Sequence, residues 1–365
     1  MKSKLFLGLA AVLAFTGCAA ESESDEKKAT EEAVTSDDVV DVDDLTIEDA
    51  DASGAAKVGE PASLLKAGRD YSKKATNDVK AVLAHVKAVV AGKTPTRTGK
   101  TADGKAFGVW EKADGGVTYK LVVVRLAEGR VRYFLAGKKG ADAYLSLMTG
   151  IFVKKAARSG GGRMHLSLTN AAKLNPNLKW NGSIHVWFAT HKGDFRGRRV
   201  AYKGVKPTDN DKAPPANYVM DFIHEKGKGG RIRVLGVGEK VVENRPGVEA
   251  IALRIRWKNS VGGRADAVLM HVEPKPVAKI GELHECWDKG GMRKAYKDDI
   301  AANDGEDANE GKTETCDGFD EEKVAQAAAA EDGGDKDAEL DALLKDAGAA
   351  DIPEADADAA TDPAP

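Results

Sequence analysis

The sequence predicts a mainly β protein, with one long N-terminal α-helix followed by a curved antiparallel sheet in meander order, either open or a half barrel. Three features predict this fold. Apolar and polar residues alternate in many short runs after Lys105, apolar residues recur at helical spacing over residues 61–91, and both ends of the chain are acidic and poor in large apolar residues. We divide the 365 residues into a leader (1–17), an acidic disordered tether (18–59), a helix plus antiparallel β domain (60–297), an acidic loop closed by a disulfide (298–322) and an acidic, alanine-rich low-complexity tail (323–365).

Strand patterns fill the body of the chain. Residues 164–168 (MHLSL), 184–188 (IHVWF), 231–235 (RIRVL) and 249–257 (EAIALRIRW) alternate apolar and polar side chains, as a strand with one buried face does. Glycine-containing turn sequences separate these runs, and few helical patterns lie between them. We therefore expect about ten strands in an antiparallel meander, and a sheet of that size tends to curl.

A helix is predicted over residues 61–91. Its apolar positions, which include Leu64, Val79, Leu83 and Val90, fall on one face, and Gly92 ends the pattern. The opposite face is basic. We expect this helix to pack across the sheet; the alternative is that it lies on an anionic membrane surface.

The first eighteen residues have the layout of a bacterial lipoprotein leader. Two lysines precede an 11-residue run of apolar residues and glycine, 5–15, which is far shorter than the roughly 20 residues that a membrane-spanning helix needs. Residues 15–18 (FTGC) resemble a lipobox, in which a cysteine is acylated and becomes the mature N-terminus. We therefore expect a lipid anchor on Cys18. Ala19 after it favours the outer membrane, with the body periplasmic or surface-exposed.

Charge is distributed unevenly along the chain. Residues 1–55 hold 4 basic and 14 acidic residues, and residues 298–365 hold 4 and 23. Subtracting these from the totals of 55 and 58 leaves 47 basic and 21 acidic residues in the segment between, a net charge of +26. Clustered positive charge attracts polyanions, and tethered acidic segments act at about millimolar effective concentration. We expect the body to bind an anionic partner and its own tails to mask it.

Basic residues recur at i, i+2 in several predicted strands, so each set projects from one side of its strand. The alternative interpretation is a solvated sheet face whose charges discourage edge pairing. The candidate anion-binding residues are Arg130, Arg132, Arg196, Arg198, Arg231, Arg233, Arg254, Arg256 and Lys258.

Two cysteines remain in addition to Cys18. Cys286 and Cys316 are an even pair, which in an oxidising compartment predicts a disulfide. The alternative is a metal site formed by these cysteines with His284. The oxygen-rich run 303–310 is an exposed acidic loop or a weak calcium site, because it lacks the spacing of an EF-hand.

Motifs of the common catalytic classes are missing from the sequence. It has no GxSxG elbow, no phosphate-binding loop and no HExxH, and its 7 histidines form no i, i+4 pair in a helical pattern. We therefore expect a protein that is not an enzyme, with no catalytic residues, no cofactor and no metal.

The C-terminal part of the body carries a family resemblance. Residues 263–267 (GRADA), residues 285–288 (ECWD), Tyr296 and the closing Cys316 resemble the end of uncharacterised outer-membrane-type lipoproteins of the myxobacterial kind. The resemblance covers about 60 residues and the lipobox, and it implies the same location and a disulfide. It implies no activity.

These observations favour a non-enzymatic, lipid-anchored protein of the cell envelope. Its partners are expected to be the membrane, through the anchor, and an anionic lipid head group, lipopolysaccharide or polysaccharide; nucleic acid is not expected. The alternative is a carrier or chaperone that holds a hydrophobic ligand or lipoprotein acyl chains in a half-barrel cavity, an idea that rests on analogy of fold.

Overall fold

A computed structural model describes residue 34 and residues 62–91, 93–101, 104–126, 129–156, 159–191, 195–210, 212–239, 247–299 and 308–311. The predicted leader, the lipidation site Cys18, the tail 323–365 and Cys316 lie outside the described residues. Most of the predicted tether and of the loop 298–322 lies outside them as well.

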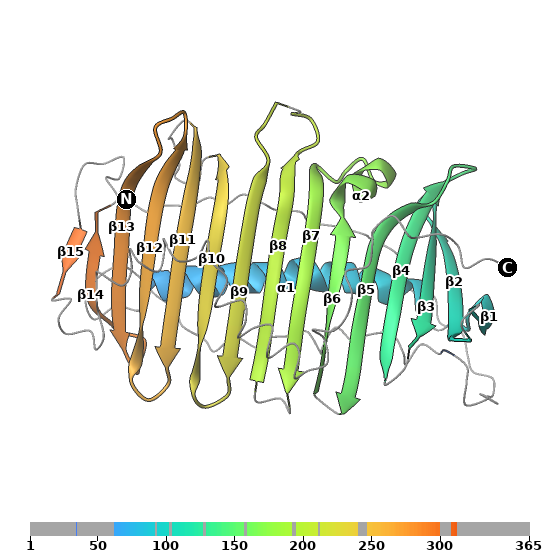
Figure 1. Cartoon of the computed structure of the whole chain (residues 1–365), viewed down its shortest axis with the longest axis horizontal. Helices are drawn as coiled ribbons and strands as arrows, with labels where there is room; N and C mark the ends of the chain where they lie inside the picture. Colours follow the sequence, from blue (N-terminus) through green and yellow to red (C-terminus); the bar gives the residue numbers. More distant parts are fainter. Residues whose placement is uncertain are drawn as a thin grey trace.

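Within the described residues, fifteen strands form one antiparallel sheet, in which each strand pairs with the next along the chain (Figure 1). The order runs from β1 to β15, so the described sheet is open, and the predicted antiparallel β fold is confirmed. The strands are β1 (Arg97–Lys100), β2 (Ala106–Asp114), β3 (Val117–Arg125), β4 (Arg130–Lys139), β5 (Leu145–Ala156), β6 (Ser159–Ser167), β7 (Trp180–His191), β8 (Phe195–Pro207), β9 (Ala216–Glu225), β10 (Gly229–Glu239), β11 (Val248–Lys258), β12 (Gly262–Glu273), β13 (Ala278–Asp288), β14 (Arg293–Asp298) and β15 (Ala308–Glu310).

Helix α1 (Ser63–Val90) runs across the strands along the long axis of the molecule (Figure 1). It contacts β2 and β3 near one end and β10 and β11 nearer the other. The helix lies close to the sheet at Gly68, where a Cβ atom would overlap Cδ1 of Ile255 on β11. A larger residue here would require the Ile255 side chain to shift. A second, short helix, α2 (Leu168–Leu174), follows β6 and is capped by Ser167, whose Oγ accepts a hydrogen bond from the N–H of Asn170.

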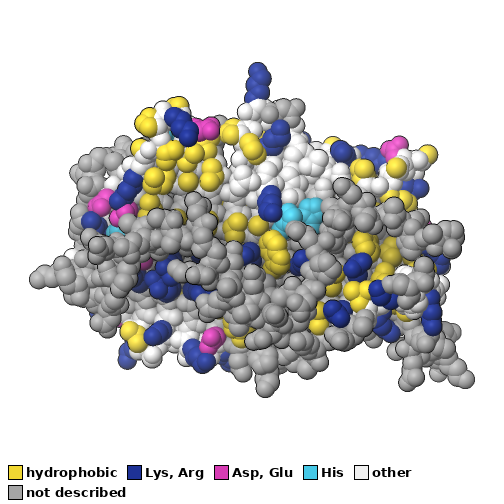
Figure 2. Space-filling model, in the orientation of Figure 1, with side chains coloured by type: hydrophobic (Ala, Val, Ile, Leu, Met, Phe, Trp, Pro, Cys, Tyr) yellow, Lys and Arg dark blue, Asp and Glu magenta, His cyan; other side chains and the backbone are white. Residues whose placement is uncertain are grey.

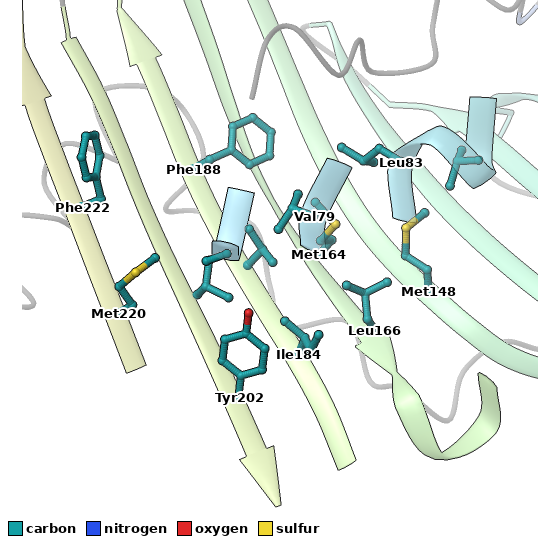
Figure 3. Close-up of a cluster of buried hydrophobic side chains, with 14 of the residues drawn as sticks. Val79, Leu83, Met148, Met164, Leu166, Ile184, Phe188, Tyr202, Met220 and Phe222 are labelled. Carbon is teal, nitrogen blue, oxygen red and sulfur yellow. The ribbon is translucent and has the colours of Figure 1, made fainter. Parts of the chain in front are cut away.

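We call the sheet face that α1 covers the inner face and the opposite side the outer face. Val79 and Leu83 of α1 lie among Met148, Met164 and Ile184 of the inner face (Figure 3). All five side chains are buried, and they belong to one hydrophobic cluster that extends from Trp110 on β2 to Trp287 on β13. Because side chains alternate along a strand, this cluster fixes which residues of each strand face outward.

The start of α1 is held by β13 and β14. Ala62, at the N-cap position, offers no side-chain oxygen, and the Glu285 carboxylate of β13 instead accepts hydrogen bonds from the N–H groups of Ser63 and Leu64. Arg293 of β14 donates to the same carboxylate at 2.6 Å. An acidic group at a helix N-terminus is stabilised by the helix dipole, so this buried pair positions the whole helix.

One residue of the acidic N-terminal segment belongs to the main core. Val34 is only 1% exposed and belongs to the same hydrophobic cluster as Trp110. Its Cβ would lie 3.4 Å from a Cβ atom at Gly108, on the inner face of β2. No helix among the described residues is long and apolar enough to cross a membrane.

Candidate functional site

One of the nine predicted anion-binding residues, Arg198, is buried under the helix, and a second, Arg196, lies on the same face of the sheet. Arg198 on β8 is 2% exposed and donates hydrogen bonds to Thr76 Oγ1 at 2.5 Å and to the Ser72 carbonyl at 2.8 Å, both on α1. Arg196, two residues earlier on the same strand, shares this side of the sheet. The prediction that Arg198 binds an external anion is therefore wrong, because its guanidinium is buried under α1.

Arg130 and Arg132 lie on the outer face, but far from the others. They alternate with the core residues Val131 and Tyr133 on β4. Six strand spacings separate β4 from β10, about 29 Å at about 4.8 Å for each spacing. The structure therefore does not bring this pair into one site with Arg231 and its neighbours.

The other predicted residues come together on the outer face of β10 and β11. In the pairing register, Arg231 lies opposite Arg256, and Arg256 lies opposite Arg264 of β12. Three guanidinium groups thus stand side by side on adjacent strands, where like charges directly opposite each other are destabilising. We call the basic cluster on this part of the sheet the basic half, which consists of Arg231, Arg233, Arg254, Arg256, Lys258 and Arg264.

The carboxylates within reach are already engaged. Asp221 on β9 accepts from Arg199 Nε at 2.6 Å and from Arg233 Nε at 2.8 Å. Asp266 on β12 accepts from Arg264 Nε at 2.9 Å and lies 3.0 Å from His284 Nδ1. Among the described residues, Asp221 and Asp266 thus each serve more than one partner of this region.

Arg256 is the least compensated member of this group. Its side chain is exposed and makes no hydrogen bond or ion pair with the part of the chain that the structure describes. Desolvation lowers the pKa of its guanidinium, and the charges of Arg264 and Arg231 lower it further, while only Asp266 opposes them. An anion at this position would relieve the repulsion.

The other end of the same three strands is apolar on the outer face. Figure 2 shows hydrophobic side chains gathered over β10, β11 and β12, on the face that also carries Lys and Arg side chains. Val237 is 37% exposed, and Leu235 lies opposite Ala252, which lies opposite Val268. We call this patch the apolar half; it consists of Leu235, Val237, Ala250, Ala252, Val268 and Met270. Together the two halves form an amphipathic surface.

His284 lies beside the basic half, on β13. Its ring is fully buried, with Nδ1 3.0 Å from Asp266 Oδ1 and Nε2 3.2 Å from Glu282 Oε2. Burial lowers its pKa, but the hydrogen bonds and charges of the two carboxylates outweigh this, so the pKa of His284 is raised. Both ring nitrogens are engaged and Cys286 is disulfide-bonded, which argues against the metal site considered for His284 and the cysteines. The partner of Cys286 lies outside the described residues, so its pairing with Cys316 stays a prediction.

A pair of histidines lies on the outer face further along the sheet. His165 and His185 are opposite each other on β6 and β7, with ring centroids 4.6 Å apart. Burial lowers the pKa of His185 to about 4, and the charges of His165 and Lys203 contribute. Burial also lowers the pKa of His165, so both rings favour the neutral form. Among the described residues, no group of three or more His, Cys, Asp or Glu is placed to hold a metal ion.

No protein-family model, curated protein or solved structure matches this chain. The site therefore has to be interpreted from its own geometry.

Sequence reasoning missed Arg264 and the apolar half. Arg264 is the only lysine or arginine of β12, so the search for basic residues at i, i+2 did not find it. Its position beside Arg256 follows from the register across the β11–β12 turn. The alternation in residues 249–257 could have indicated the apolar half, because it places Ala250 and Ala252 on the same face of the strand as Arg254 and Arg256.

Proposed function

We propose that this chain is a non-enzymatic, lipid-anchored protein of the cell envelope whose amphipathic surface on β10–β12 binds an anionic lipid. The head group would lie on the basic half and the apolar part of the lipid on the apolar half. The observation that carries the proposal is the placement of Arg256, an exposed cation between Arg231 and Arg264 and in line with the apolar side chains of its own strand.

The apolar half favours a lipid over a soluble polysaccharide. A polysaccharide would engage only the arginines, whereas a lipid would also cover Leu235 and Val237. Basic residues near an anionic membrane surface contribute about 1 kcal/mol each. A lipid anchor at Cys18 would supply a second attachment, and stable membrane binding generally takes two.

The inner face offers no support for the alternative of a half-barrel carrier. The space between α1 and the sheet, where such a carrier would hold an acyl chain, is packed with side chains such as Val79, Leu83 and Met164 (Figure 3). Our proposal therefore concerns the outer face.

The test compares Arg256→Gln with Arg97→Gln in the full chain. Both variants lose one positive charge, but Arg97 is exposed on β1, at the far end of the sheet. We expect Arg256→Gln to weaken co-sedimentation with phosphatidylglycerol–phosphatidylcholine vesicles about fivefold, the equivalent of about 1 kcal/mol, and Arg97→Gln to leave it unchanged. Equal effects of the two variants would overturn the proposal. So would binding of heparin that depends on Arg256 without any binding of vesicles, since this would point to a polysaccharide.

A further inference from the structure

The amphipathic surface has a matching segment within the chain itself. Residues 336–347 (KDAELDALLKDA) carry Leu340, Leu343 and Leu344 at i, i+3, i+4, the spacing of one face of a helix. They are the only leucines of the last 43 residues, 323–365. Four carboxylates (Asp337, Glu339, Asp341 and Asp346) and two lysines (Lys336 and Lys345) accompany them, a net charge of −2. The segment therefore combines an apolar group with net negative charge, as the surface combines an apolar half with a basic half.

The surface is within reach of this segment. The last described residue is Gly311, beside Lys294 and Ala295 of β14. Four strand spacings separate β15 from β11, about 19 Å. Twenty-five residues connect Gly311 to Lys336, and they can span at most about 85 Å. A tethered group is present at about millimolar effective concentration, so even weak intrinsic affinity gives high occupancy.

We propose that residues 336–347 dock on the amphipathic surface of β10–β12, with the three leucines on the apolar half and the carboxylates on the basic half. This segment and an anionic lipid then compete for one surface. That the competitor is a lipid rests on the proposed function. Either occupant would place negative charge beside Arg256, which lies between Arg231 and Arg264. The protein therefore exchanges its own acidic segment for the membrane.

The segment, and not the acidity of the tail as a whole, provides the specificity. A tail that acted only through charge would be equally effective with its leucines removed. The triple variant Leu340→Ser/Leu343→Ser/Leu344→Ser keeps every charge and removes the apolar contact. Its matched control is Ala327→Ser/Ala329→Ser/Ala330→Ser, which adds the same hydroxyl groups elsewhere in the tail.

Vesicle binding by full-length chains gives the first readout. A segment that occupies the surface nine-tenths of the time weakens the apparent affinity for lipid about tenfold. The leucine variant is therefore expected to bind phosphatidylglycerol-containing vesicles about tenfold more tightly than the parent chain, and the alanine variant to bind as the parent does. Equal affinities for all three proteins would overturn the inference.

Carbodiimide cross-linking, which joins a carboxylate to an amine, gives a second readout that needs no lipid. Lys258 is exposed in the basic half, and Lys105 is exposed at the other end of the sheet. We expect mass spectrometry to find Lys258 joined to Asp337, Glu339 or Asp341, with these products lost in the leucine variant. Two results would overturn the inference. One is that Lys258 is cross-linked to Asp356 and Asp358 as often as to Asp337, and the other is that Lys105 forms the same cross-links as often as Lys258. If the leucine-dependent cross-links form but no variant binds vesicles, the docking stands and the proposed lipid function fails; if vesicle binding depends on Arg256 but not on the leucines, the reverse holds.

Discussion

The Glu285 carboxylate on β13 accepts hydrogen bonds from the backbone N–H groups of Ser63 and Leu64, at 2.8 and 2.7 Å, and thereby caps α1 from 222 residues further along the chain. Arg293 lies against the same carboxylate, and its guanidinium also donates to Ser63 Oγ at 2.6 Å. The side chains of Glu285 and Arg293 are both fully buried. The N-terminus of the helix is therefore defined by the last part of the sheet and not by its own sequence.

Replacing Glu285 by Gln should destabilise the protein strongly. The variant leaves the Arg293 charge buried without its partner and weakens the cap, and breaking a buried pair in this way costs about 3–5 kcal/mol. Urea unfolding measures the change in the free energy of unfolding. Glu111→Gln, on an exposed position of β2, is the control and should change it by no more than about 0.5 kcal/mol. Similar values for the two variants would show that the Glu285–Arg293 pair does not hold α1.

Arg198→Gln should affect stability and not lipid binding. The side chain is buried between β8 and α1, and hydrogen bonds to a charged donor contribute about 1.5–3 kcal/mol each. We expect a loss of about 2–4 kcal/mol in urea unfolding, with vesicle binding of the folded protein unchanged. Arg256→Gln should show the opposite pattern, because its side chain is exposed. A loss of vesicle affinity in folded Arg198→Gln protein would contradict the burial of this side chain.

The antiparallel sheet could be predicted because its signal is local. The alternation in residues 231–235 and 249–257 lies within β10 and β11. Helical spacing over residues 61–91 coincides with α1, Ser63–Val90. In each case the residues that alternate or recur are close in sequence, so the pattern determines the element.

The site was only partly predictable, because it depends on register and on which face α1 covers. The sequence suggested that Arg198 is a surface residue. However, Arg198 alternates in step with Val200 and Tyr202 of the core, and this spacing could have indicated that it lies on the inner face. The contact of Arg264 with the predicted arginines depends on the turn between β11 and β12. Glu285 gave no sequence signal as a cap, because the helix that it caps begins 222 residues earlier.

His284 should make stability decrease as the pH rises above neutrality. Asp266 and Glu282 raise the pKa of its buried ring despite desolvation, and Lys297 of β14 is opposite it in the pairing register. The folded state therefore favours the protonated ring. This contribution to the free energy of unfolding is complete below the ordinary histidine pKa of about 6.5 and is lost as the pH rises through the raised pKa. Urea unfolding between about pH 6 and pH 9 should show a fall that His284→Gln reduces; equal slopes for the two proteins would contradict the prediction.

His185 provides a control with the opposite sign. Its pKa is lowered to about 4, so the folded state favours the neutral ring. Its contribution is complete above about pH 6.5 and is lost as the pH falls toward 4. His185→Gln should therefore alter the acid side of the stability profile and leave the alkaline side, where His284 acts, unchanged.

Val34→Asp should release the acidic N-terminal segment from the body at a cost in stability. Val34 is 1% exposed, against Gly108 and Trp110, so a carboxylate at this position loses apolar contacts and its own hydration, about 2–4 kcal/mol in all. The matched control is Val261→Asp, because Val261 is 55% exposed in the turn before β12 and should tolerate the change. Urea unfolding compares the two, and equal stabilities would show that Val34 does not hold the segment.

The contact of Val34 with the body also affects where the predicted lipid anchor would hold the sheet. Only 16 residues separate Cys18 from Val34, which span at most about 58 Å, whereas the 41 residues from Cys18 to Gly59 span at most about 150 Å. With Val34 in place, a lipid on Cys18 would keep the β2 end of the sheet nearest the membrane, and Val34→Asp should lengthen the distance that fluorescence energy transfer measures between a vesicle surface and a label on Lys105→Cys.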